Sequence, residues 1–120
     1  MSRPTTSDPP LKQRRSPRFP FDSLVRVASP RLGEETPLWG RSTDLCREGI
    51  GMEVMIGELV PDEVVGMEIA LPSAISVAVR ASVRYYTEAR CGCEFVDLHD
   101  PQREAIQAAC ERLRKAAGRG

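Results

Sequence analysis

The sequence contains one histidine, few aromatic residues and no long apolar run, and each shortage excludes a class of protein. His99 alone cannot complete a Cys/His zinc site, and the four cysteines show no C-x-x-C spacing. No apolar stretch approaches the roughly 18 residues of a transmembrane helix, and no basic-then-apolar secretory signal opens the chain. We therefore expect a cytoplasmic protein with reduced thiols, no membrane insertion and no bound metal.

Net charge is also absent. Seventeen basic and 17 acidic residues balance, so non-specific binding to nucleic acid is not expected. The charge is unevenly distributed, however. Residues 1–18 contain five basic residues and one acidic residue, a net charge of +4, so the rest of the chain carries about −4. A basic arm ahead of a mildly acidic body can bind an anion locally.

Aromatic residues are too few for a single-stranded nucleic-acid binder, and catalytic groups are too few for an enzyme. The two Tyr, one Trp and three Phe lie mostly in apolar contexts, so the stacking platform of a single-stranded nucleic-acid binder is missing. No Ser/His/Asp or Cys/His arrangement is present, and Cys46 has no recognisable base beside it. We expect neither catalytic residues nor a nucleic-acid partner.

The length and the distribution of prolines predict one domain with a tail. A chain of 120 residues suits a single domain. Residues 1–13 contain three prolines among Ser, Thr and charged residues without apolar periodicity, which predicts a flexible N-terminal tail. Residues 14–117 then form the domain.

Alternating apolar residues and turn signals predict six strands, at residues 23–28, 38–45, 49–55, 64–71, 75–86 and 91–97. The fifth alternates most strictly, with one predicted buried face formed by Ile75, Val77, Val79, Ala81, Val83 and Tyr85. The second contains a misfit, because Arg41 shares a face with Trp39 and Leu45. Either a rim position or a bulge would explain this.

The last segment predicts a helix at residues 101–116. Asp100 suits the N-cap and Pro101 the first helical position. An apolar stripe then recurs at helical spacing, formed by Ile106, Ala109, Cys110 and Leu113. Six short strands and a closing helix predict an all-β fold, a small six-stranded antiparallel β-barrel with a C-terminal α-helix.

Arg14, Arg15 and Arg18 form a cluster of guanidinium groups on a segment that cannot be helical. Pro17 and Pro20 disfavour helix at the residues before them, so the arginines point in different directions from an extended arm. Arginine pairs through two bonds with phosphate oxygens or with the Hoogsteen edge of guanine. The arm therefore suits a compact, guanine-bearing anion, although a solvated basic tail is the simpler alternative.

Asp44, Cys46 and Gly49 follow at the end of the second predicted strand. An ionised Asp44 can accept hydrogen bonds from N1–H and the exocyclic amine of guanine. Alternation places Cys46 on the same face, where a short polar side chain would donate to a ligand. Gly49 permits positive φ and close backbone approach. A plain Asp-capped turn between two strands is the alternative.

Together these segments resemble the signature of the PilZ domain, a bacterial receptor for cyclic di-GMP. Arg14 and Arg18 fit its R-x-x-x-R element, and Asp44, Cys46 and Gly49 occupy its [D/N]-x-S-x-x-G element. The segments RRSPRFPFDSLVRV, GRSTDLCREGIGMEV and CGCEFVDL stand in the family's order. The resemblance implies that the arginines bind guanine and phosphate, with Arg15 assisting, and that Asp44 holds a guanine edge.

One departure from the signature is Cys46, where the family usually has serine. A thiol is a weaker donor than a hydroxyl, so we expect weakened but surviving affinity. The resulting hypothesis is a non-enzymatic receptor whose arginine arm orders on binding cyclic di-GMP and signals to a partner protein. The alternative is a PilZ-like interaction module that does not bind the nucleotide.

Overall fold

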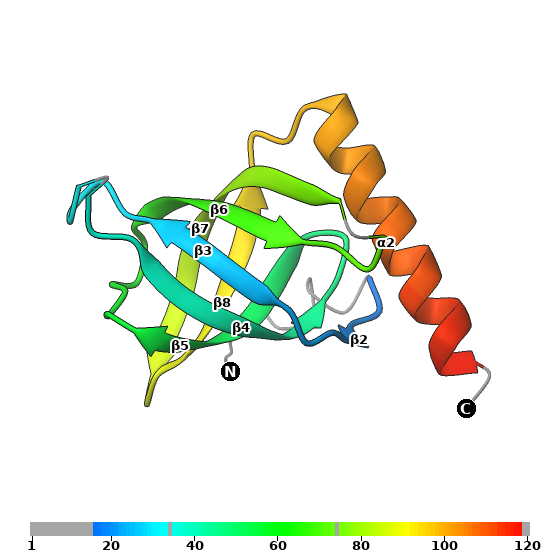
Figure 1. Ribbon diagram of the computed structural model, residues 1–120, viewed down its shortest axis with the longest axis horizontal. Helices are drawn as coiled ribbons and strands as arrows, with labels where there is room; N and C mark the ends of the chain where they lie inside the picture. Colours follow the sequence, from blue (N-terminus) through cyan, green and yellow to red (C-terminus); the bar gives the residue numbers. More distant parts are fainter. Residues whose placement is uncertain (1–15, 34, 74, 119–120) are drawn as a thin grey trace, which may run out of the picture.

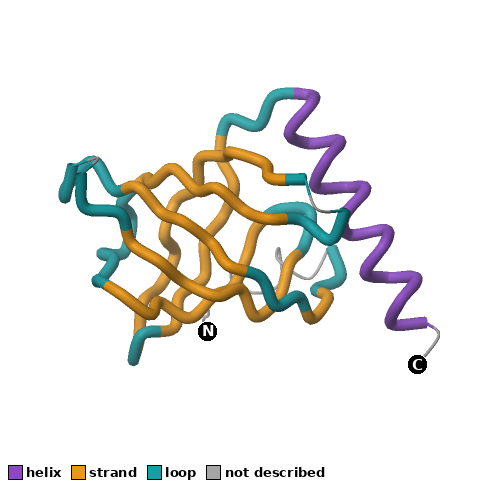
Figure 2. Tube along the Cα trace, viewed as in Figure 1, coloured by secondary structure: helices purple, strands orange, loops and turns teal. Residues whose placement is uncertain are grey.

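The described residues form a closed antiparallel barrel with one helix (Figures 1 and 2). The computed structural model describes residues 16–33, 35–73 and 75–118. The predicted tail of residues 1–13, and with it Arg14 and Arg15, lies outside the described residues. The elements are β2 (Phe19–Pro20), β3 (Leu24–Ala28), β4 (Leu38–Leu45), β5 (Gly49–Ile56), β6 (Val64–Ala70), β7 (Ser76–Thr87), β8 (Arg90–Val96) and α2 (Asp100–Gly118).

Six of these strands form the ring. The order is β4-β3-β6-β7-β8-β5, and pairing of β4 with β5 closes it. Every pairing is antiparallel. Because the ring is closed, none of its six strands has an open edge. The predicted all-β barrel with a C-terminal helix is confirmed. The two-residue strand β2, which pairs with the end of β4, was not predicted.

The barrel interior holds one apolar core. Alternate residues of each strand point inward, and Val25, Leu45, Ile50, Ile69 and Val83 are fully buried. In β8, the alternate residues Cys91, Cys93 and Phe95 are all buried in this core. The four cysteines are free and buried, as expected for small apolar side chains in a core.

Two β-bulges correct the predicted faces. The pairing of β4 with β5 shifts between Ser42 and Asp44, so Arg41 points out and Leu45 points in. Of the two explanations for Arg41, the bulge holds. The pairing of β7 with β8 shifts between Val83 and Tyr85. The prediction that Tyr85 faces the core is wrong, because the bulge turns Tyr85 outward, where it is 49% exposed.

Helix α2 runs across one end of the barrel (Figure 1). Ile106, Ala109 and Cys110 join the core, and Leu113 packs against it. The helix begins one residue earlier than predicted. The Arg103 N–H donates to the His99 carbonyl, and the Gln102 side chain accepts a bond from the His99 N–H at 2.7 Å. His99, rather than Asp100, therefore takes the N-cap position.

Candidate functional site

The two sequence motifs meet where β2 lies beside the end of β4. Pro20 is the pairing partner of Asp44, which places Arg18 next to the Asp44 side chain. Arg18 Nε lies 3.5 Å from Asp44 Oδ1, and the two side chains are 40% and 31% exposed. The barrel therefore brings one arginine of the arm and the carboxylate of the turn together, although 26 positions separate them in the sequence.

The Asp44 carboxylate is incompletely satisfied. Oδ1 is buried yet has no hydrogen-bond partner in the described part of the chain, and its distance to Arg18 is that of an ion pair without a well-formed hydrogen bond. A buried acceptor without a donor costs about 1–3 kcal/mol. Asp44 is thus equipped to accept hydrogen bonds from a ligand.

Glycine on the neighbouring strand makes room for this carboxylate. Asp44 pairs with Gly51 of β5. A Cβ at position 51 would stand 3.1 Å from both Asp44 carboxylate oxygens and 3.2 Å from Thr43 Oγ1. The carboxylate therefore occupies the space that a side chain at position 51 would need. Nothing in the local sequence pattern distinguishes Gly51, because its contact with Asp44 depends on the register of β5 with β4.

A second link joins the two motifs. The Ser16 hydroxyl, inside the arginine element, donates to Glu48 Oε2 at 2.5 Å. Glu48 lies inside the turn element, whose backbone is closed by a bond from the Cys46 N–H to the Gly49 carbonyl. Ser16 is 6% exposed. The arm is therefore attached to the turn at Ser16, a contact between two positions at which the family signature leaves the residue open.

Cys46 is buried just beyond the end of β4. β4 ends at Leu45, and Cys46 is only 3% exposed. It lies near Cys110 of α2, where burial and then the neighbouring Cys46 raise the pKa of Cys110 to about 11. Cys46 therefore packs between turn and helix, and its role as a donor to the ligand stays a prediction.

Gly49 allows two strands of the barrel wall, β5 and β8, to approach each other closely. It is not among the described glycines with positive φ, which are Gly33 and Gly57. A Cβ at position 49 would overlap the Cys93 carbonyl of β8. The expected positive φ is thus absent. The close backbone approach is present, and it joins β5 to β8.

Two further arginines, Arg80 and Arg84, lie on β7. Arg80 pairs with Asp97 at 3.1 Å and Arg84 with Glu94 at 3.4 Å, all on the outer surface. Both guanidinium groups therefore have carboxylate partners already.

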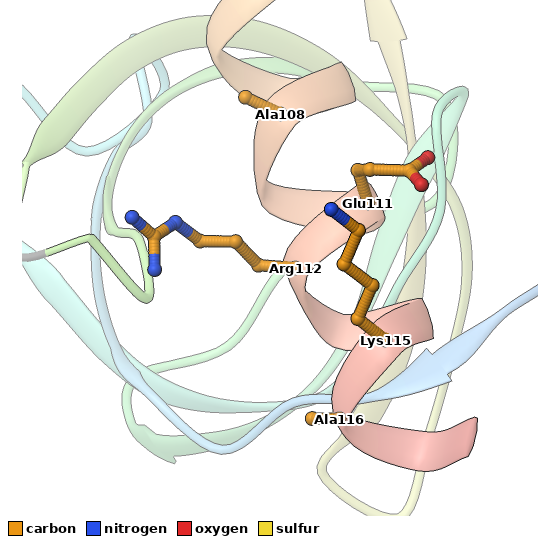
Figure 3. A pocket seen from close by; sticks show the side chains of 5 residues that line it. All are labelled: Ala108, Glu111, Arg112, Lys115 and Ala116. Carbon is orange, nitrogen blue, oxygen red and sulfur yellow. The ribbon is translucent and has the colours of Figure 1, made fainter. Parts of the chain in front are cut away.

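Two hollows accompany these contacts. One, of about 570 Å³, lies on the barrel wall and is lined by Pro20, Phe21, Asp22, Arg41, Ser42, Thr43 and Glu53. Its lining thus includes Pro20, which pairs with Asp44, and Thr43, which precedes Asp44 in the chain. The other, of about 610 Å³, lies on the outer face of α2 and is lined by Ala108, Glu111, Arg112, Lys115 and Ala116 (Figure 3). Because the first hollow contains the strand partner and the chain neighbour of Asp44, we place the candidate site on the wall.

Within residues 16–33, 35–73 and 75–118, no group of three or more His, Cys, Asp or Glu side chains could hold a metal ion. No helix in the described part of the chain is both long and apolar enough to cross a membrane.

The PilZ domain family matches residues 12–112. This chain belongs to the PilZ domain family. The match includes Arg14, Arg18, Asp44 and Gly49, and so covers both motifs. No curated protein matches the sequence.

Solved PilZ structures share the fold at low sequence identity. The PilZ domain of YcgR from Escherichia coli, with c-di-GMP, superposes with a TM-score of 0.74 at 13% identity, covering 88% of this chain and 94% of that one. MrkH of K. pneumonia, in complex with c-di-GMP, has the same TM-score at 17% identity, covering 88% and 53%. The PilZ domain of CeSA from a cellulose-synthesizing bacterium has a TM-score of 0.62 at 18% identity, covering 76% and 91%.

Proposed function

We propose that this PilZ protein is a non-enzymatic receptor for cyclic di-GMP. The observation that carries the proposal is the Asp44 carboxylate beside Arg18, with a buried oxygen that has no hydrogen-bond donor among residues 16–33, 35–73 and 75–118. The structures of YcgR and MrkH with c-di-GMP support the same ligand for this chain.

Each proposed contact follows from the chemistry of the ligand. Asp44 accepts from N1–H and the exocyclic amine of one guanine, which supplies the donors that Oδ1 lacks. Arg18, released from its loose ion pair, shares the guanine edge or a phosphate with Arg14 and Arg15. Gly49 holds β5 close to β8 beneath the turn, and Cys46 takes the place of the usual serine.

The proposed signal is a change in the arginine arm. Ser16 and Arg18 are already attached to the barrel, so the rearrangement concerns the arm ahead of Ser16. Charge-assisted bonds from Arg14 and Arg15 to the ligand would offset the entropy lost on ordering that segment. The ordered arm would then be presented to a partner protein in the cytoplasm.

The alternative is a PilZ-like module that docks on a partner without binding the nucleotide. Retention of both arginines of the R-x-x-x-R element argues against it. The buried oxygen of Asp44, which has no donor among the described residues, argues against it as well, since a buried carboxylate oxygen with a purely structural role is normally hydrogen-bonded.

Isothermal titration calorimetry with cyclic di-GMP tests the proposal. We expect binding in the micromolar range or tighter, resistant to competition by GTP, and weakened at least about 30-fold by Arg18→Ala. Arg103→Ala is the matched control, because Arg103 is a similarly exposed arginine in an ion pair with Asp100, on α2. Absence of binding heat in the unsubstituted protein would favour the nucleotide-free module.

A further inference from the structure

Four residues on neighbouring strands form one row across the outer wall of the barrel. Asp44 of β4 pairs with Gly51 of β5, Gly51 pairs with Gly92 of β8, and Gly92 pairs with Tyr85 of β7. The ends of the row are a carboxylate and an aromatic ring, and its two middle positions have no side chains.

The ring of Tyr85 lies over Gly92 as the carboxylate of Asp44 lies over Gly51. A Cβ at position 92 would stand 2.9 Å from Cζ and 3.2 Å from Cδ2 of Tyr85, and closer still to Cε2. The ring therefore lies on the backbone of β8. Because Tyr85 is 49% exposed, the ring remains accessible from solvent.

The bulge between Val83 and Tyr85 produces this arrangement. Strict alternation would have placed Tyr85 in the core, with Val83. With the bulge, the ring joins the outer face that carries Asp44. One strand spacing, about 5 Å, separates the two glycines, so the carboxylate and the ring lie within reach of a single planar base.

The rows on either side differ from this one. One contains Gly49, Glu94 and Ser82, with Glu94 paired to Arg84. On the other side, Glu53 pairs with Arg90 and Arg90 with Thr87. The row with the two glycines is thus a low strip bordered by charged side chains, and an aromatic ring lies at its end.

We infer that Tyr85 is a stacking platform for a purine base whose hydrogen-bonding edge is held by Asp44. The inference rests on the proposed function and extends it by assigning a residue outside the two sequence motifs. A base stacked on Tyr85 directs its N–H donors along the strip toward the buried oxygen of Asp44. Neither contact alone selects a purine with donors on that edge, whereas the pair does.

Calorimetric titration of the full chain with cyclic di-GMP tests Tyr85 directly. Base–aromatic stacking is worth enough that Tyr85→Ala should weaken binding by about 5- to 150-fold. Tyr85→Phe, which keeps the ring, should bind within about twofold of the unsubstituted protein. Circular dichroism and thermal unfolding establish that both variants fold.

Two glycine substitutions provide an independent measurement. Gly92→Ala would displace the ring of Tyr85 and should weaken binding as Tyr85→Ala does. Gly66→Ala on β6 is the matched control, because a Cβ there meets nothing within 4 Å, and it should leave the affinity unchanged.

The outcomes separate the two proposals. Unchanged affinity in Tyr85→Ala, alongside tight binding by the unsubstituted protein, would overturn the platform and leave the receptor standing. Equal weakening by Tyr85→Phe and Tyr85→Ala would assign the effect to the hydroxyl and overturn stacking. No binding by the unsubstituted protein would overturn both.

Discussion

Glu63 and Asp44 are two partly buried carboxylates on the same barrel, and their surroundings are opposite. Glu63 accepts hydrogen bonds from the Ser29 hydroxyl at 2.6 Å, the Val60 N–H at 2.6 Å and Arg31 at 3.1 Å. Asp44 has Arg18 at 3.5 Å and a buried oxygen with no donor in the described part of the chain. The Glu63 carboxylate thus has its hydrogen-bond donors without a ligand, whereas the Asp44 carboxylate can still accept hydrogen bonds from a ligand.

The pKa of Glu63 reflects its hydrogen-bond donors. Burial alone raises the pKa of this carboxyl, but the hydrogen bonds from Ser29 and Val60, with the charge of Arg31, outweigh burial and lower it below its ordinary value of 4.5. The carboxylate therefore stabilises the loops that join β3 to β4 and β5 to β6. Asp44 has no such set of donors, so we expect it to contribute to binding rather than to stability.

Glu63→Ala should have the largest effect on stability. It removes three hydrogen bonds and leaves the Ser29 hydroxyl, 1% exposed, without a partner, which costs about 3 kcal/mol of the free energy of unfolding. Urea denaturation measures the loss. Affinity for cyclic di-GMP should stay unchanged. A large fall in affinity would show that Glu63 also contributes to binding, and would contradict the distinction between Glu63 and Asp44.

The pH dependence of stability in Glu63→Gln tests whether the charge of Glu63 stabilises the fold. Because the folded protein lowers the pKa of Glu63, its charge stabilises the fold above pH 4.5, and this stability is lost as the pH falls through the folded pKa. The gap between wild type and Glu63→Gln should be about 1–2 kcal/mol at pH 7 and narrow below pH 4.5. A gap that widens in acid would contradict the assigned donors.

Cys46→Ser has the smallest expected effect. A hydroxyl donates more strongly than a thiol, so cyclic di-GMP should bind roughly 2- to 10-fold more tightly. Calorimetry of the two proteins side by side measures the change. Since Cys46 is buried near Cys110, weaker or unchanged binding would assign Cys46 to packing alone.

Local patterns in the sequence were enough to predict the barrel. Alternation and turn residues located the ends of six strands to within one residue, because a half-buried strand must alternate. Strand β2 was missed because two residues, one of them proline, carry no periodic signal. The helix start differed by one residue, since the Gln102 side chain caps His99.

The site was only partly predictable, because its remaining parts depend on register. Asp44 and Arg18 stood out as motif residues. Gly51 and Tyr85 did not, because the position of Gly51 beside Asp44 and the outward turn of Tyr85 arise from strand pairing and from a bulge that an alternating pattern does not reveal. The exposed ring of Tyr85 is an exception to the expectation that the aromatic residues lie mostly in apolar contexts.

Asp44→Asn tests the central claim most directly, with affinity and stability measured on the same preparation. The account predicts that the affinity for cyclic di-GMP falls about 10- to 150-fold, since hydrogen bonds to a charged acceptor are lost. It also predicts that the free energy of unfolding stays within about 0.5 kcal/mol of the original or rises. Unchanged affinity together with a large loss of stability would make Asp44 a structural carboxylate like Glu63 and contradict the account.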